Sequence, residues 1–302
     1  MRKILLYTTI TCFFLGIFLM NSVFALDYVL GARAGFFFWR PFYKDLPSGS
    51  GFEDIRTGHG GLYGPIAVVN VSDAISLSIS GLFGQQTTQW HSWDGSGVSH
   101  SGEAYNFSRT SYVEANRYDV DSAVSFAVVS GFRIFAGYKY QYMKVDWFST
   151  ERIYVISNNS TEIRDTEFEF RVPLHGLALG CGYSVQLSDL YFAMINASGI
   201  YTRGLFKYSQ LSTKYNNNGI VPPQPDNPNP RHESDEIDLH QFGFNIEPSI
   251  GIRTAGPLVS IGARFQFLRN QFYKIETSGD GPDDRWMNDY LYGVFVTVMY
   301  VL

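Results

Sequence analysis

The last twelve residues read LYGVFVTVMYVL (Leu291–Leu302), and this pattern is typical of a β-strand. Successive side chains of a strand point to opposite faces of its sheet. A soluble sheet would not normally display an apolar face as long as this one, whereas the lipid-facing wall of a membrane barrel does. The even-numbered face carries no charge and consists of Tyr292, Val294, Val296, Val298, Tyr300 and Leu302.

Residues 1–25 have the pattern of a secretory signal peptide. Two basic residues are followed by an apolar stretch, and Val23-Phe24-Ala25 offers a small-residue cleavage site. An uncleaved membrane anchor is the alternative, but the apolar stretch is short and interrupted by threonines. We therefore expect an exported product, 26–302, that forms one barrel domain. Cys181 is its only cysteine, which excludes an internal disulfide.

Composition narrows the class of protein further. Aromatic residues make up 17% of the chain and there are 29 glycines, which suits either a secreted β-sandwich or a membrane barrel. Several patterned runs exceed ten residues, the length that a tilted membrane strand needs, whereas sandwich strands are about five or six residues long. The formal net charge of −5 gives no reason to expect nucleic-acid binding.

Period-2 alternation predicts an all-β fold, an antiparallel up-and-down transmembrane barrel of about ten strands within a range of eight to twelve. Short turns alternate with long connections, as in bacterial outer-membrane barrels with periplasmic turns and extracellular loops. The long loops are expected at 41–60, 89–116, 148–166, 209–238 and 273–285. The strands are expected at 27–40, 61–71, 74–88, 117–128, 132–147, 167–187, 190–208, 239–253, 258–272 and 286–302.

One strand changes phase along its length. In 167–187 the apolar residues are even-numbered from Phe168 to Leu174 and odd-numbered from Leu177 to Leu187. If apolar side chains always face lipid, a one-residue bulge near His175-Gly176 is required.

The polar faces of the strands predict a charged lumen. Hairpin registers place Asp121 opposite Lys139, with Val129-Ser130-Gly131 as a three-residue loop, and Glu247 opposite Arg264. A ten-strand barrel has little free interior, so a filled polar core is favoured over a selectivity-lining channel. The expected lumen charge network comprises Arg33, Asp119, Asp121, Arg133, Lys139, Glu169, Arg171, Glu247, Arg253 and Arg264.

Exposed aromatic residues in the expected loops are candidates for ligand binding, because loops carry function and Trp and Tyr anchor interfaces. An interfacial aromatic girdle is the alternative for those at strand ends. The proline-rich stretch 221–230 predicts extended, polyproline-like chain. Nothing in the sequence predicts a metal site or a cofactor. The surface-loop candidates are Trp90, His91, Trp93, Tyr105 and Tyr215.

The segments Phe170–Tyr183 and Phe132–Tyr138 resemble strands of the omptins, outer-membrane proteases with ten-strand barrels, and the overall plan is similar to that of ten-strand adhesins. The resemblance implies paired acids and an Asp-x-His pair at the barrel mouth. Asp119-Val120-Asp121 and Asp238-Leu239-His240 have those spacings. However, strand parity points Asp238 and His240 outward, and Asp121 is already assigned to Lys139, so the catalytic geometry fails.

The sequence therefore predicts a monomeric, non-enzymatic protein of the outer membrane with a surface binding, adhesion or structural role. A narrow small-solute channel and an omptin-like protease are the alternatives. Expected partners are outer-membrane lipid and lipopolysaccharide, the barrel-assembly machinery and an extracellular ligand. Tyr300 and Leu302 resemble the C-terminal assembly signal of outer-membrane proteins, which usually ends in Phe.

Overall fold

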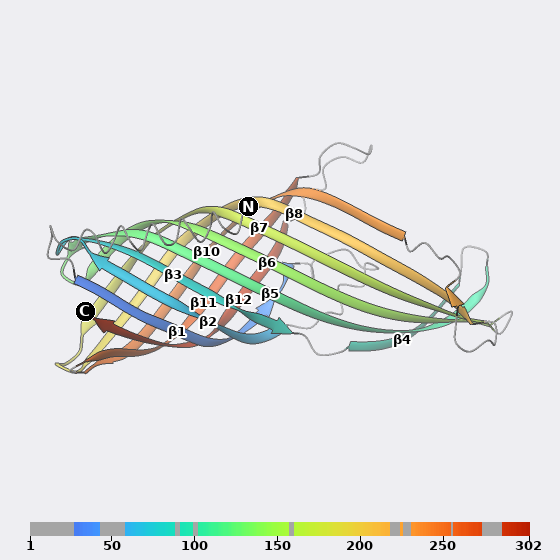
Figure 1. The fold of residues 1–302 in the computed structure, drawn as a ribbon, viewed down its shortest axis with the longest axis horizontal. Helices are drawn as coiled ribbons and strands as arrows, with labels where there is room; N and C mark the ends of the chain where they lie inside the picture. Colours follow the sequence, from blue (N-terminus) through green and yellow to red (C-terminus); the bar gives the residue numbers. More distant parts are fainter. Residues whose placement is uncertain are drawn as a thin grey trace.

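The computed structural model describes residues 27–42, 58–87, 91–98, 102–156, 160–217, 224–225, 231–254, 256–273 and 286–302. No helix in these ranges is both long and apolar enough to cross a membrane. The expected signal peptide lies outside the described residues. The strands (Figure 1) are β1 (Asp27–Arg40), β2 (Gly58–Asn70), β3 (Ile75–Thr87), β4 (His91–Val98), β5 (Ala104–Val129), β6 (Phe132–Val155), β7 (Ser160–Gln186), β8 (Tyr191–Asn217), β9 (Gln224–Pro225), β10 (Arg231–Arg253), β11 (Pro257–Tyr273) and β12 (Trp286–Val301).

Within the described residues, ten strands close an antiparallel ring. Its order is β1-β2-β3-β5-β6-β7-β8-β10-β11-β12, and β12 pairs with β1 from Val301 opposite Val29 to Tyr290 opposite Arg40. β4 pairs with β5 and β9 with β8 outside this ring. Each strand of the ring matches one of the ten strands that the sequence predicts, so the predicted all-β barrel is confirmed.

Three of the predicted long loops, 89–116, 148–166 and 209–238, are wrong over much of their length, because strands extend into them. β5, β6, β7 and β8 contain 26, 24, 27 and 27 residues, and they extend as a sheet beyond one end of the ring (Figure 1). The apolar alternation stops where the outer face leaves lipid, since a face in water needs no apolar side chains. We call the parts of β4 to β10 that lie beyond the end of the ring the extended sheet.

The turn between β5 and β6 is tighter than the sequence predicts. Val129 pairs with Phe132, so the turn consists of Ser130 and Gly131 alone, and Gly131 has a φ of 78°. A register shift between Ala127 and Val129 adds a bulge. The bulge compensates for the shorter turn, and Asp121 therefore still lies opposite Lys139.

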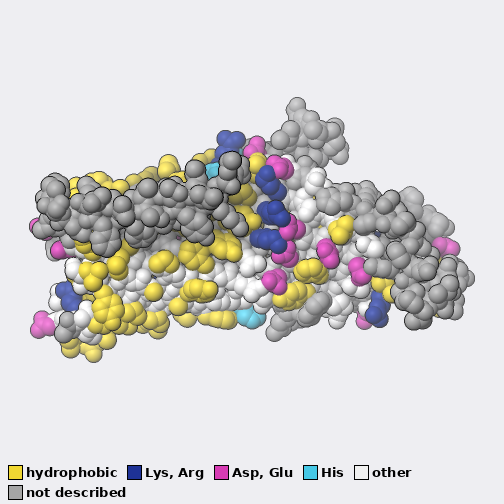
Figure 2. Space-filling view, viewed as in Figure 1, with side chains coloured by type: hydrophobic (Ala, Val, Ile, Leu, Met, Phe, Trp, Pro, Cys, Tyr) yellow, Lys and Arg dark blue, Asp and Glu magenta, His cyan; other side chains and the backbone are white. Residues whose placement is uncertain are grey.

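The outer surface of the ring is an apolar belt (Figure 2). Its side chains include Phe36, Ile79, Phe126, Leu179, Ile250 and Val294, each between 40% and 64% exposed. Charged residues on the same strands point inward, where Glu247, Arg264 and Lys139 are buried. Apolar outside and polar inside is the arrangement expected of a barrel surrounded by lipid.

β7 contains no bulge at His175-Gly176. Its register with β6 runs unbroken from Phe132 opposite Tyr183 to Val155 opposite Ser160. Leu177 and Leu179 are exposed on the outside, whereas Val172 and Leu174 are 1% exposed and point into the interior. The predicted bulge is wrong because apolar residues occupy the outer face at one end of β7 and the inner face at the other.

The same reversal occurs at matching positions of neighbouring strands. Tyr140 lies opposite His175, His175 opposite Arg203, and Arg203 opposite His240. On one side of this row the outer face is apolar and the inner face polar, and on the other side the two are exchanged. We call the row of Tyr140, His175, Arg203 and His240 the boundary row, and it marks the level at which the wall passes from lipid to water.

Candidate functional site: the barrel interior and the extended sheet

A buried ion-pair cluster lies inside the ring, on the lipid side of the boundary row. The Glu247 carboxylate accepts hydrogen bonds from Arg264 Nε at 2.6 Å and from Arg33 Nη1 at 3.0 Å. Arg33 also donates to Thr297 and lies over the ring of Phe295. Side chains of β10, β11 and the distant β1 thus meet at one carboxylate, and the predicted Glu247–Arg264 pair is present.

A second cluster lies on β5 and β6. Lys139 Nζ is 2.8 Å from Asp121 Oδ1, the pairing that the sequence register predicts. Asp119 accepts from Arg117 Nε at 3.1 Å, and both side chains are at most 1% exposed. Sequence reasoning missed Arg117. It lies two residues before Asp119 and therefore on the same inward face, so its parity could have identified it.

The remaining predicted members of the lumen charge network divide between inside and outside. Arg133 donates to Ser76 Oγ at 3.1 Å on the inner side, and Arg253 is exposed at the end of β10. Glu169 and Arg171 were expected inside, but they lie on the outer surface and pair with each other at 2.6 Å. Glu169 and Arg171 are odd-numbered, like Leu177 and Leu179, and therefore share their outer face. The predicted bulge would have turned them into the lumen.

Beyond the boundary row most buried side chains form an apolar layer, although Arg117 and Ser149 are also buried there. Stacked aromatic rings cross this layer, with Trp147 and Phe168 centroids 4.5 Å apart and Phe170 and Phe206 centroids 5.3 Å apart. Trp39 Nε1 donates to Asp289 Oδ2 at 2.9 Å at its edge. The layer is composed of Phe37, Trp39, Phe42, Leu62, Leu82, Val113, Ala115, Met143, Val145, Trp147, Phe170, Val172, Leu174, Leu239, Met287, Leu291 and Phe295. An apolar layer and charged clusters in contact with it therefore fill the interior, where the sequence predicted charged filling only.

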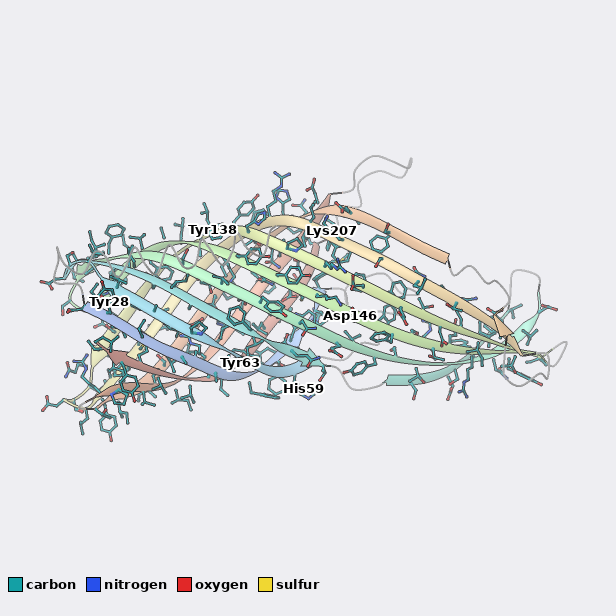
Figure 3. The ribbon with its side chains drawn as sticks, in the orientation of Figure 1. Tyr28, His59, Tyr63, Tyr138, Asp146 and Lys207 are labelled. Carbon is teal, nitrogen blue, oxygen red and sulfur yellow. The ribbon has the colours of Figure 1, made fainter. Side chains whose placement is uncertain are left out.

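Ion pairs form a band on the outer surface, next to the boundary row. Lys144 lies 2.8 Å from Asp146 and 3.0 Å from Glu169, and Lys207 pairs with Glu236. Figure 2 shows basic and acidic side chains gathered in a band beside the apolar belt. In Figure 3 Tyr138 lies within the apolar belt, whereas Asp146 and Lys207 lie beyond it. The hydrogen bond to Asp146 raises the pKa of Lys144. Burial raises the pKa of Glu169, but the hydrogen bond and charge of Lys144 outweigh it, and the net shift is downward.

Within the described residues, the structure does not bring together the two pairs whose spacing fits an omptin-like mechanism, Asp119 with Asp121 and Asp238 with His240. Asp238 and His240 lie on the outer surface of β10, where His240 Nδ1 is 2.9 Å from the Tyr201 hydroxyl and Asp238 is 3.8 Å from Arg203. Asp119 and Asp121 are paired inside the ring. Burial and Arg203 lower the pKa of His240, while Asp238 opposes them.

The predicted surface-loop candidates differ in where they lie. Trp90 lies outside the described residues, and His91, Trp93 and Tyr215 belong to β4 and β8, with side chains that are not described. Tyr105 is half-buried in β5, where its ring covers Gly97 of β4. Of the proline-rich stretch only Gln224 and Pro225 are described, and they pair with Asn216 and Tyr215. Tyr300 and Leu302 are exposed beside the first residues of β1.

No protein-family model and no curated protein sequence matches the chain. Several solved outer-membrane barrels are similar to it in fold. The outer membrane protease OmpT from Escherichia coli is 11% identical with a TM-score of 0.43, covering 92% of this chain and 96% of that one. CarO from Acinetobacter baumannii is 11% identical with a TM-score of 0.27, covering 88% and 95%. Neisserial surface protein A is 8% identical with a TM-score of 0.29, covering 91% and 96%.

Proposed function

We propose that the protein is an outer-membrane barrel that binds a ligand at the cell surface through its extended sheet. The observation that carries the proposal is strand length. β5 to β8 contain 24 to 27 residues each, whereas a membrane strand needs about 9 to 11. Spanning the membrane does not account for the remaining residues of these strands.

The interior supports binding rather than transport. The Glu247 cluster and the apolar layer in contact with it occupy the lumen, and their side chains are buried. An interior of ten strands is only slightly wider than one that side chains fill completely. Solute passage would require displacement of both, so we assign the function to the outside of the molecule.

The proposed membrane setting also accounts for the outer surface. The apolar belt would contact lipid, and the adjacent ion pairs, such as Lys144 with Glu169, would lie at the level of lipid or lipopolysaccharide headgroups. We propose that the short turns face the periplasm, that the extended sheet projects from the cell, and that the barrel acts as a monomer.

The test is adherence of cells that carry a shortened sheet. One variant lacks 91–111, 149–166 and 211–232, and an Asn-Gly turn joins Phe148 to Glu167 and Gln210 to Glu233, which already lie opposite each other. A matched control replaces Ser72-Asp73, at the opposite end, by Asn-Gly. Cells that express each form are compared on cultured epithelial cells and on plates coated with mucin or fibronectin.

We expect the full chain and the turn control to adhere above empty-vector cells and the shortened variant to lose this adherence. Heat-modifiable gel mobility establishes that each barrel is assembled. Equal adherence of the assembled shortened variant on every surface, or no adherence of the full chain above the vector, contradicts the proposal.

A further inference from the structure

The outer face of the extended sheet is strongly polar near its tip. Three cross-strand rows of side chains lie there on β4, β5, β6 and β7, with the parity of the lipid-facing residues lower on the same strands. We call these rows the polar grid. They are Ser92–Thr110–Thr150–Asp165, Asp94–Ser108–Arg152–Ile163 and Ser96–Asn106–Tyr154–Thr161.

The second and third rows, apart from Ile163, border a shallow groove of about 570 Å³ that is open to solvent and that Gly95 and Phe107 also line. This volume lies within the range of about 300–1,000 Å³ typical of small-molecule sites. Hydroxyl, amide, carboxylate and guanidinium groups all reach it, and Tyr154 is 39% exposed at its edge. The groove thus offers hydrogen-bond donors and acceptors together with one aromatic surface.

Asp94 and Arg152 keep their hydrogen-bonding capacity for a ligand. Neither forms an ion pair with another residue in the described ranges, whereas Arg109, beside Ser108 on the opposite face, pairs with Glu151 at 2.8 Å. Ser108 separates Asp94 from Arg152 in the row. Two strand spacings of about 4.8 Å place their backbones about 10 Å apart, too far for a direct pair between extended neighbours but suited to a ligand that spans both.

Packing on the opposite face holds β4 in place. The rings of Phe107 and Tyr105 lie over Gly95 and Gly97, so closely that a Cβ would be 2.6 Å from the first ring and 2.7 Å from the second. Only glycine allows this approach, and the covered glycines fix the register of β4 on β5. The polar grid is therefore preorganised, which reduces the entropic cost of binding.

We propose that the polar grid binds an uncharged, hydroxyl-rich oligosaccharide, an inference that rests on the surface-binding function proposed above. Arg152 donates to ligand hydroxyl oxygens, Asp94 accepts from ligand hydroxyl groups, and the Tyr154 ring covers the apolar face of a sugar ring. The backbone groups of β5 and β6 are already paired within the sheet, so an added peptide strand would find no partners on this face.

The position of the polar grid suits two sources of such a ligand. Asn106 lies fourteen residues along β5 from Val120, which is opposite Tyr140 of the boundary row, and this corresponds to about 48 Å along the strand at ~3.4 Å per residue. The two candidate sources are glycans of another cell and the polysaccharide of the protein's own envelope. The shared chemistry is the neutral, hydroxyl-rich chain.

The experiment uses the full barrel, refolded in detergent, on an array that carries neutral mammalian oligosaccharides, neutral bacterial polysaccharide repeats, and sialylated and sulfated glycans. Calorimetry then measures affinity for the strongest neutral glycan. The variants are Asp94→Asn, Arg152→Gln and Tyr154→Leu, with Arg109→Gln as the matched control on the opposite face of the same sheet.

We expect a neutral glycan to bind, each of the three variants to lose at least tenfold in affinity, and Arg109→Gln to bind like the wild type. The mammalian and bacterial arms of the array identify the source. Binding of acidic glycans only, no binding at all, or neutral binding that the three variants leave unchanged overturns the inference. Loss of adherence by the shortened sheet, combined with an array without neutral hits, would leave the proposed function intact and overturn this ligand.

Discussion

The two ends of β7 have the same backbone register and opposite side-chain chemistry. From Leu177 onward the exposed face is apolar, and before His175 the exposed face carries Arg171 and Glu169 while Val172 and Leu174 are buried inside. A lipid solvent selects apolar side chains on the outside, and water selects them on the inside. The polarity of a strand face therefore indicates which solvent the face contacts at that level. The inner and outer faces must be assigned separately for each end of a strand.

The largest expected effect of a substitution is in the buried ion-pair cluster around Glu247. Glu247→Ala leaves Arg264 and Arg33 without the carboxylate that both contact. Removal of one partner from a buried ion pair costs about 3–5 kcal/mol. Guanidinium unfolding of the refolded barrel measures the loss. Glu236→Ala, which removes the exposed partner of Lys207, should cost less than about 1 kcal/mol. Equal losses would mean that the interior is not a low-dielectric site.

The apolar layer can be compared with the belt on a single strand. Leu174→Ala removes a side chain that is 1% exposed in the interior and should cost about 2–5 kcal/mol by leaving a cavity. Leu179→Ala, on the outer face, should cost less, because lipid fills the space. The same unfolding assay tests both variants, and a larger loss for Leu179→Ala would contradict the assignment of the two faces.

A charge placed on either side of the boundary row tests the change of solvent. Cys181→Arg puts a cation on the belt and should destabilise the barrel by about 2–4 kcal/mol if it lies near the bilayer centre. Thr150→Arg has an equivalent outward position in the extended sheet and should alter stability by no more than about 0.5 kcal/mol. Unfolding in lipid vesicles measures both, and similar costs would place the two residues in one environment.

The smallest effect concerns His240 on the boundary row. Its pKa is expected below the ordinary value of about 6.5, chiefly because of burial, so the folded state favours the neutral ring. The corresponding stabilisation is present above pH ~6.5 and is lost as the pH falls below that value. Arg203→Ala should raise the pKa and Asp238→Asn should lower it. NMR titration of the ring protons shows the direction, and shifts of opposite sign would refute the described contacts.

Much of the barrel follows from the sequence because lipid imposes a strict period-2 pattern. The ring strands, the Asp121–Lys139 and Glu247–Arg264 pairs, and the outward positions of Asp238 and His240 could all be predicted from parity. The apolar layer and the extended sheet could not, because beyond the lipid boundary the pattern weakens or reverses. Segment 35–40, with apolar residues on both faces, and the change of phase within 167–187 carried the signals that the interior is apolar near the mouth.

The polar grid was the least predictable part of the molecule. Residues 91–98 contain two Ser and two Gly, which is typical of a loop, yet β4 forms there on β5 because Phe107 and Tyr105 cover Gly95 and Gly97. Cross-strand packing of this kind depends on register, and composition does not reveal it.

Spin labelling along β7 tests the reversal of faces most directly. In a Cys181→Ser background, single cysteines at Glu167, Arg171, Val172, Leu174, Leu177 and Leu179 carry a nitroxide in lipid vesicles, and collision rates with oxygen and with a water-soluble nickel complex are measured. We predict high oxygen contact at 177 and 179, high nickel contact at 167 and 171, and low contact with both at 172 and 174. High oxygen contact at 172 and 174 with a protected 171 would show that a bulge exists and that the faces do not reverse.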